Sequence, residues 1–310
     1  MVLLVRAAET RRRRDGAPFL RLSLGDRSGH VLAIVRDDVP EAAEVCRPGA
    51  PVRVDGRFDR DERRGAQIEV RALGPAAPGS FDLADLLDAS PHDAQQMEDD
   101  LRQLVCTIQD AHLRTLLDRV LGEHTETWAR FRAAPAAKHY HQAYAHGLLE
   151  HSLSVALGVH ALAASFPGID HDVAVTGALL HDIGKLDAYT ADPACIDLTD
   201  AGRLQGEIPL GYYRIRREID DMPGFPPETA QAVLHIILSH HGALEHGSPV
   251  VPCTREATLV HHIDNLGGRL GSFDRLEKEL TPGQSWTGFD RAIGSSAYFG
   301  PPVADERRAA

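Results

Sequence analysis

The sequence of 310 residues predicts a multi-domain protein, with a small all-β barrel followed by an all-α domain. In residues 1–73, short apolar runs alternate with polar residues between turn signals, which is the two-residue period of strands. From about residue 91, apolar residues recur three and four positions apart, as they do on helices. A stretch rich in glycine and proline, residues 74–80, separates the two patterns.

The first domain has the element order of an OB-fold barrel. One short helix, residues 41–46, lies between the third and fourth of five strand-like runs, which is the order of that fold. We therefore expect an OB-fold domain at 1–73 and a linker at 74–90. The five runs are residues 2–8, 19–24, 30–35, 52–58 and 68–70.

OB-fold barrels hold single-stranded nucleic acid with a basic groove and stacking aromatic rings. Residues 1–73 carry 15 arginines against 12 carboxylates, a charge of +3, whereas the rest of the chain carries −15. A run of arginines in the first hairpin loop and the two aromatics of the domain are the candidate contacts. A solvated arginine loop, on a barrel used for packing or oligomerisation, is the alternative. The candidate residues are Arg11, Arg12, Arg13, Arg14, Phe19 and Phe58.

Composition excludes several classes of protein. No apolar run approaches the ~20 residues that span a bilayer, and the N-terminus is too short for a secretory signal. The four cysteines are scattered without a CxxC pair, so neither a zinc knuckle nor a disulfide framework is indicated. We expect a cytoplasmic protein without a membrane anchor, and a homo-oligomer is possible.

The second domain, expected at 91–275, places histidine and aspartate on the apolar faces of four predicted helices. Burying such groups is costly unless each finds a partner. Each alone is more often a structural residue, but together they predict a shared divalent-metal site. Mixed nitrogen and carboxylate ligands suit Mn²⁺ best, with Fe²⁺ or Mg²⁺ possible. The residues are His151, His181, Asp182, His240, His241 and Asp264. Beyond them, residues 276–310 are rich in Gly, Pro and Ser, and we expect an irregular tail.

The motifs around these residues resemble the HD-domain metal-dependent phosphohydrolase superfamily. The similarity is greater to the YhaM-type 3′-5′ exoribonuclease family, which has an N-terminal OB-fold before a helical HD domain, and it covers roughly residues 2–275. The segments that carry the resemblance are residues 147–153, 177–185, 199–204, 238–242 and 264–266.

The resemblance implies roles for individual residues. His151, His181, Asp182 and Asp264 would hold a first metal. His240 and His241 would hold a second, with Asp182 bridging the two ions. Glu207 stands where the family pattern has histidine. Its oxygen could ligate a hard cation, or the change could mark an altered or lost second site, so one or two ions are expected.

The function implied is a metal-dependent 3′-5′ exonuclease that releases nucleoside 5′-monophosphates from single-stranded RNA, or possibly DNA. Lys185 would contact phosphate, or would serve only as a cation at a helix terminus. His240 or His241, if not a ligand, would protonate the leaving oxygen. His139 and His141 are candidates to line the entrance, although at least one of them is expected to be simply a surface histidine.

Two other functions remain open. The chain could be a phosphohydrolase or phosphodiesterase acting on a small or cyclic nucleotide, with its barrel serving assembly. It could instead be an OB-fold single-strand-binding protein with a degenerate HD site. An HD-type oxygenase with paired iron is a more distant alternative.

Overall fold

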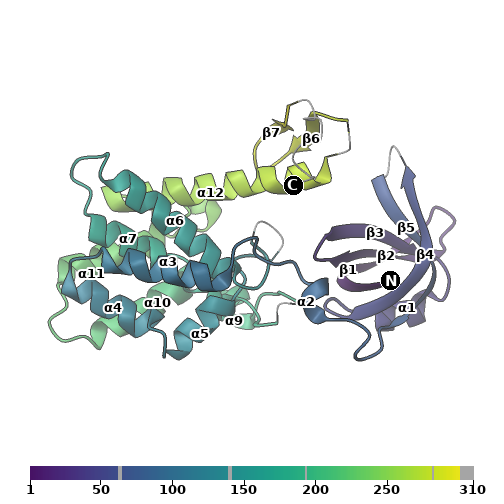
Figure 1. The fold of residues 1–310 in the computed structure, drawn as a ribbon, viewed down its shortest axis with the longest axis horizontal. Coiled ribbons are helices and arrows are strands. Elements are labelled where there is room, and N and C mark those ends of the chain that lie inside the picture. Colours follow the sequence, from purple (N-terminus) through teal and green to yellow (C-terminus); the bar gives the residue numbers. More distant parts are fainter. Residues whose placement is uncertain (62–64, 139–141, 193, 281–282, 301–310) are drawn as a thin grey trace. The chain divides into compact units, whose positions relative to one another are not determined.

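The computed structural model describes residues 1–310 except 62–64, 139–141, 193, 281–282 and 301–310 (Figure 1). The chain forms two compact units. The first comprises residues 1–91 together with 190–197, and the second comprises residues 92–189 and 198–310. The two units are described separately below.

The first unit contains a closed five-stranded barrel, as predicted. The strands follow one another around it in the order β1-β2-β3-β5-β4, with β3 and β5 parallel and the other pairs antiparallel. A helix between β3 and β4 completes the expected OB-like order. The elements are β1 (Val2–Arg12), β2 (Pro18–Asp26), β3 (Gly29–Val35), α1 (Val39–Val45), β4 (Pro51–Asp61) and β5 (Gly65–Pro75).

Alternation of side chains along the strands builds the barrel core. On β2, Leu20, Leu22 and Leu24 are buried while Arg21 is exposed, as the two-residue period requires. Closing the barrel also needs a bend, and the β4–β5 register shifts at Asp55/Gly56. A Cβ on Gly56 would lie only 2.6 Å from the Glu69 carbonyl oxygen, so glycine permits the close approach at this bend.

The expected linker is partly structured. Strand β5 extends to Pro75, and a short helix, α2 (Leu83–Leu86), lies against the barrel. Arg6 donates a hydrogen bond to the Leu86 carbonyl and lies 3.3 Å from an Asp88 carboxylate oxygen. Side chains on β1 therefore hold residues that composition alone assigned to a linker.

The second unit is helical, as predicted. Of the described residues, no helix combines the length and the apolar character needed to cross a membrane. The helices are α3 (Ala94–Cys106), α4 (Ala111–Leu121), α5 (Glu126–Ala133), α6 (Gly147–Ala163), α7 (His171–Leu180), α8 (Lys185–Ala188), α9 (Asp200–Gln205), α10 (Glu207–Asp220), α11 (Pro227–Ser239), the 3₁₀ helix η1 (Leu244–His246) and α12 (Arg255–Glu279).

Helix α7 lies at the centre of this unit. Residues 173–180 are all buried, and α7 packs against α6, α11 and α12 (Figure 1). A helix that is apolar around its whole circumference must be covered on every side. Gly177 permits the contact with α11, since a Cβ there would meet the Ile236 side chain at 2.3 Å. The polar residues directly after α7 therefore begin inside the unit.

The prediction of an irregular tail at 276–310 was wrong for the described residues between 276 and 298, and residues 281–282 and 301–310 lie outside the described part of the chain. Helix α12 runs through Glu279, and a two-stranded antiparallel hairpin follows, with β6 (Trp286–Asp290) and β7 (Ser295–Tyr298). Ile293 and Ala297 are buried with Leu276 of α12 in a small separate core. The composition, rich in Gly, Pro and Ser, suggested irregular structure. The hairpin was missed because its core depends on contacts with a helix earlier in the chain, which leave no local pattern in the sequence.

Candidate metal centre

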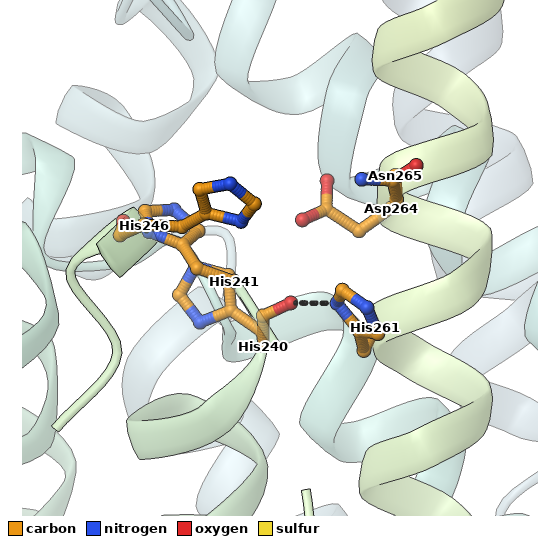
Figure 2. Close-up of a pocket in the computed structure, with 6 residues that line it drawn as sticks. All are labelled: His240, His241, His246, His261, Asp264 and Asn265. Atoms are coloured by element: carbon orange, nitrogen blue, oxygen red, sulfur yellow. Dashed lines mark hydrogen bonds between the residues drawn. The ribbon is translucent and has the colours of Figure 1, made fainter. Parts of the chain in front are cut away.

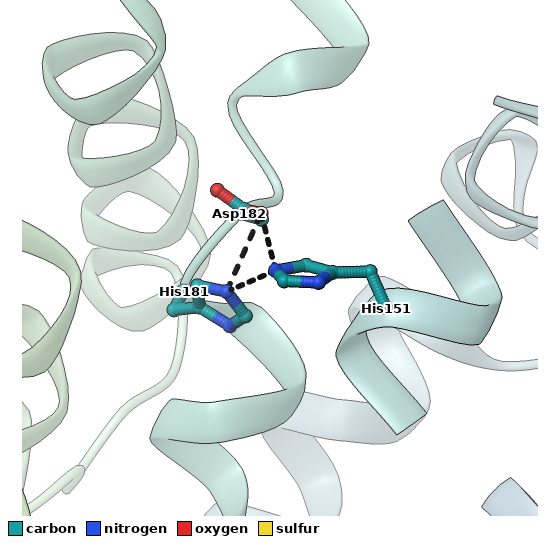
Figure 3. Close-up of side chains that lie close together, drawn as sticks. All are labelled: His151, His181 and Asp182. Atoms are coloured by element: carbon teal, nitrogen blue, oxygen red, sulfur yellow. Dashed lines mark hydrogen bonds and ion pairs between the residues drawn. The ribbon is translucent and has the colours of Figure 1, made fainter. Parts of the chain in front are cut away.

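Four histidine and aspartate side chains, from α6, α12 and the residues directly after α7, converge on one point. The Nε2 atom of His151 lies 3.1 Å from Asp182 Oδ2 and 3.2 Å from His181 Nε2 (Figure 3). It also lies 3.2 Å from Asp264 Oδ1. His151, His181 and Asp182 are all buried. Four potential ligand atoms therefore face one another, three of them on buried side chains.

Backbone carbonyl oxygens fix the tautomers of His181 and His240, and so leave the Nε2 atom of each ring available as a ligand. The Nδ1 atom of His181 lies 2.7 Å from the Ala178 carbonyl oxygen, and that of His240 lies 2.9 Å from Ile237 O. A carbonyl oxygen only accepts, so each Nδ1 carries the hydrogen and each Nε2 keeps a lone pair. Such backbone contacts are how proteins orient imidazoles that bind metals.

A buried ion pair keeps the central carboxylate ionised. Burial by itself would raise the pKa of Asp182, but the Lys185 ammonium and the histidines His181 and His151 hold that pKa well below its usual value. Lys185 Nζ lies 2.6 Å from Asp182 Oδ2. Burial would lower the pKa of Lys185, and the nearby Asp182 carboxylate instead raises it. Both groups are therefore charged at neutral pH.

His151 carries a proton in this environment. Burial would lower its pKa, but hydrogen bonds to Asp182 and Asp264 outweigh burial and raise the pKa to about 9. For Asp264, burial would raise the pKa, but His151 and His181 hold it below the usual range. A single proton on His151 Nε2 thus lies among three acceptors, which is the electrostatic environment that a cation requires.

A second group of ligand atoms shares Asp182. The other oxygen of this carboxylate, Oδ1, lies 3.5 Å from His240 Nε2. Both atoms are buried, and neither has a hydrogen-bond partner among the described residues. Buried polar atoms without partners are rare and indicate a missing ligand or ion. Asp182, His240 and His241 also place ligand atoms within 4.8 Å of one another.

Glu207 lies beside this second group. Its Oε1 atom is 3.7 Å from Nε2 of His241, whose Nδ1 lies 2.9 Å from the His246 carbonyl oxygen. Burial and the neighbouring His240 lower the pKa of His241, so its ring is neutral near pH 7. The carboxylate that departs from the family pattern is therefore placed where it could contribute an oxygen ligand.

Three residues to which the sequence assigned no role, His261, Gly242 and Gly184, shape this region. His261 Nδ1 lies 2.7 Å from the His240 carbonyl oxygen, and this contact holds the turn after α11 (Figure 2). Gly242 has a φ of +81°, and a Cβ there would meet the His261 ring at 2.1 Å. A Cβ on Gly184 would lie 1.9 Å from Glu207 O. The glycine of the His-Asp-Ile-Gly-Lys segment was visible in the sequence, but its contact with α10 was not.

Two cavities open onto the ligands. One, of about 300 Å³, is lined by His240, His241, His246, His261, Asp264 and Asn265 (Figure 2). The other, of about 360 Å³, has Asp182, Lys185 and Asp264 in its wall together with Arg269 and Ala292. The donor set of imidazole nitrogens and carboxylate oxygens fits a divalent ion, and a substrate has access to it. His139 and His141, expected at the entrance, lie outside the described residues.

The candidate nucleic-acid contacts lie on the barrel. Arg12, Arg13 and Arg14 are exposed at the turn after β1, whereas Arg11 forms an ion pair with Glu9 at 2.8 Å. Phe58 is 62 % exposed, and Phe19 is half-buried. The two rings are on β4 and β2, which are separated by β1 in the barrel order. The arginines are accessible, but the two rings do not lie on adjacent strands.

Comparison with known proteins gives two results. The family model described as HD domain matches residues 148–268, the span from His151 to Asp264. Relatives named 3′-5′ exoribonuclease YhaM match nearly the whole chain. The protein from Geobacillus sp. (strain WCH70) is 29 % identical over 288 residues, covering 93 % of this chain and 87 % of the relative. The protein from Bacillus subtilis (strain 168) is 28 % identical over 301 residues, covering 96 % and 93 %.

Proposed function

We propose that this chain, a homologue of the YhaM exoribonucleases with an HD domain at residues 148–268, is itself a metal-dependent 3′-5′ exonuclease. Its substrate would be single-stranded RNA, with single-stranded DNA as a second possibility. The products would be nucleoside 5′-monophosphates. We place this activity in the cytoplasm, in keeping with the four free cysteines.

One observation carries this proposal: Asp182 belongs to both groups of ligand atoms. Its Oδ2 faces His151 and His181, while its unpartnered Oδ1 faces His240. A carboxylate that offers one oxygen to each of two sites is suited to bridging two cations. Paired metal sites are characteristic of enzymes that displace groups at phosphorus.

The ligand set favours Mn²⁺ over the other ions considered. Neutral imidazoles and carboxylates together suit Mn²⁺ or Fe²⁺, whereas a site of oxygens alone would suit Mg²⁺. A divalent ion bound here supplies an activated water and neutralises charge on the phosphate. We assign His151, His181, Asp182 and Asp264 to the first ion. Asp182, His240, His241 and Glu207 would hold the second.

Side chains around the ligands would position the substrate. Lys185 lines the larger cavity and remains protonated, so its ammonium can approach a non-bridging phosphate oxygen. His241 is partly exposed and neutral, and it lines both cavities. If Glu207 does not support a second ion, His241 would be placed to give a proton to the leaving 3′ oxygen.

The direct test is substitution of Asp182. Asp182→Ala should lower the rate of mononucleotide release from labelled single-stranded RNA by about a thousandfold or more, because both ions lose a ligand. Asp118→Ala, at an exposed carboxylate on α4, is the matched control. An unchanged rate for Asp182→Ala would refute the assignment. Hydrolysis of small or cyclic nucleotides, without cleavage of RNA or DNA, would support the phosphohydrolase alternative instead.

The barrel would hold the nucleic acid through its arginine loop. We expect replacement of Arg12, Arg13 and Arg14 by serine in the full chain to raise KM for single-stranded RNA and to weaken its salt dependence. The rate on bis-p-nitrophenyl phosphate, which is too small to contact two domains, should not change. If KM for RNA also stays constant, the barrel serves assembly rather than substrate binding.

A further inference from the structure

The C-terminal hairpin, residues 286–298, presents three large aromatic side chains to solvent. Trp286 is 59 % exposed, Phe289 72 % and Tyr298 53 %. The rings of Trp286 and Tyr298 lie side by side across the two strands, with centroids 4.7 Å apart. Exposed apolar side chains that gather on one short element mark an interaction surface.

The hairpin is fixed to the helical unit. The Arg275 guanidinium lies 2.7 Å from an Asp290 carboxylate oxygen, and Arg269 donates a hydrogen bond of 3.0 Å to the Ile293 carbonyl. Ile293 and Ala297 point into the small core with Leu276 of α12. The hairpin follows α12 and lies beside its C-terminal end (Figure 1). Its side chains therefore divide into a buried set on α12 and the exposed rings.

The turn of this hairpin borders the candidate metal centre. Ala292 lies in the wall of the same cavity as Asp182 and Lys185, and Arg269 of α12 lines the space between them. A guanidinium has five N–H donors, and Arg269 uses one of them on Ile293. Arg269 therefore brings a guanidinium to the wall of the cavity that a phosphodiester backbone would enter. Arg291, in the turn, is also exposed.

We propose that the hairpin is a binding platform for single-stranded RNA just upstream of the bond to be cleaved. In this arrangement Trp286 and Tyr298 stack on bases, and Arg269 contacts a backbone phosphate. This inference rests on the proposed exonuclease function and adds a substrate-binding surface to it. Exposed aromatic rings next to arginine are the combination that binds single strands without reading their sequence.

The geometry gives the platform a direction. The turn lies at the cavity, whereas the Trp286–Tyr298 pair is at the other end of the hairpin, about 10 Å away at the rise of a β-strand. The 3′-terminal nucleotide would lie at the metal centre, and bases a few nucleotides upstream would reach the two rings. A substrate too short to reach the rings should therefore gain nothing from them.

The test compares long and short substrates. The double variant Trp286→Ala/Tyr298→Ala should raise KM for single-stranded oligoribonucleotides roughly tenfold or more, with kcat little changed. Arg269→Ala should raise the same KM. The double variant should not alter kcat/KM for bis-p-nitrophenyl phosphate or a dinucleotide, because neither reaches the two rings. Phe166→Ala and Arg114→Ala, at exposed positions elsewhere in the helical unit, are matched controls.

A binding measurement complements the kinetics. RNA added to the full chain in EDTA should quench tryptophan fluorescence, and Trp286→Phe should abolish the quenching because Trp128 is buried. An unchanged KM in the hairpin variants, with RNA cleavage intact, would overturn the platform but not the proposed function. A change of oligomeric state in light scattering, again with unchanged KM, would assign the hairpin to a contact between copies. Failure of the unaltered protein to cleave RNA would overturn both.

Discussion

Lys185 Nζ lies 2.6 Å from Asp182 Oδ2, with the lysine side chain 14 % exposed and the aspartate side chain 2 % exposed. The two residues are three positions apart at the end of α7 and the start of α8. The ammonium thus neutralises the carboxylate that both groups of ligand atoms share. Electrostatic support for the candidate metal centre comes from within the His-Asp-Ile-Gly-Lys segment itself.

Replacing this lysine should weaken the fold in a way that metal corrects. Lys185→Met leaves the Asp182 carboxylate buried without its counterion, and we expect a loss of about 3 kcal/mol in the free energy of unfolding in EDTA. Added Mn²⁺ would neutralise the carboxylate and reduce the loss. Urea denaturation with and without Mn²⁺ measures the free energy of unfolding in each condition. Lys278→Met, at an exposed position on α12, is the control. An equal loss in both conditions would contradict the electrostatic explanation.

Metal affinity should rise with pH up to about pH 9. Hydrogen bonds to Asp182 and Asp264 raise the pKa of His151 from 6.5 to about 9, so a metal that binds at neutral pH must displace this proton. The raised pKa of His151 also sets the direction in which the stability of the metal-free fold changes with pH. The protonated ring stabilises the metal-free fold below pH 6.5, and this contribution is lost as pH rises toward 9.

Calorimetric titration of Mn²⁺ in buffers with different ionisation enthalpies should therefore detect release of about one proton at pH 7. The release should vanish above pH 9, where His151 is neutral before the metal arrives. Asp182 and Asp264 add no protons near pH 7, because their pKa values are lowered. Release that does not vary between pH 6 and pH 10 would exclude His151 as its source.

Gly184 should not tolerate a side chain. A Cβ at this position would lie 1.9 Å from the Glu207 carbonyl oxygen and 2.4 Å from the Gly211 nitrogen, both in the backbone of α10. Gly184→Ala should push α10 away and cost about 2 kcal/mol or more in unfolding free energy. Gly267→Ala is the matched control, because a Cβ there meets nothing within 4 Å, and it should be neutral or stabilising. Thermal denaturation of both variants measures this difference, and equal melting temperatures would contradict the prediction.

Glu207 should determine how many ions bind. With its carboxylate 3.7 Å from His241 Nε2, Glu207 would be a ligand of the second ion only. We expect elemental analysis of the dialysed protein to give about two ions per chain, and about one for Glu207→Ala. Glu44→Ala, at an exposed carboxylate on α1, should match the unaltered protein. Equal metal content in Glu207→Ala would show that the residue is not a ligand.

Much of the fold could be predicted because its signals are local. The Leu20, Leu22 and Leu24 alternation specifies a strand with one buried face. The run of residues 173–180 in α7, apolar or small except for Thr176, specifies a helix covered on all sides. The hairpin at 286–298 was missed for the opposite reason. Its short strands are stabilised by Arg269, Arg275 and Leu276 of α12. Such contacts cannot be predicted from the sequence of the hairpin alone.

The sequence alone determined the chemical identity of the candidate site. Histidine and aspartate at the apolar ends and faces of four helices need a shared partner, whatever the packing, because burying them unpaired is costly. Only the tertiary structure decided which atoms meet. It gave each Asp182 oxygen a different set of neighbours, placed Glu207 beside His241, and set the aromatic hairpin against the cavity. These contacts join segments distant in the sequence, and such distances are set by the packing of whole helices rather than by any local run of residues.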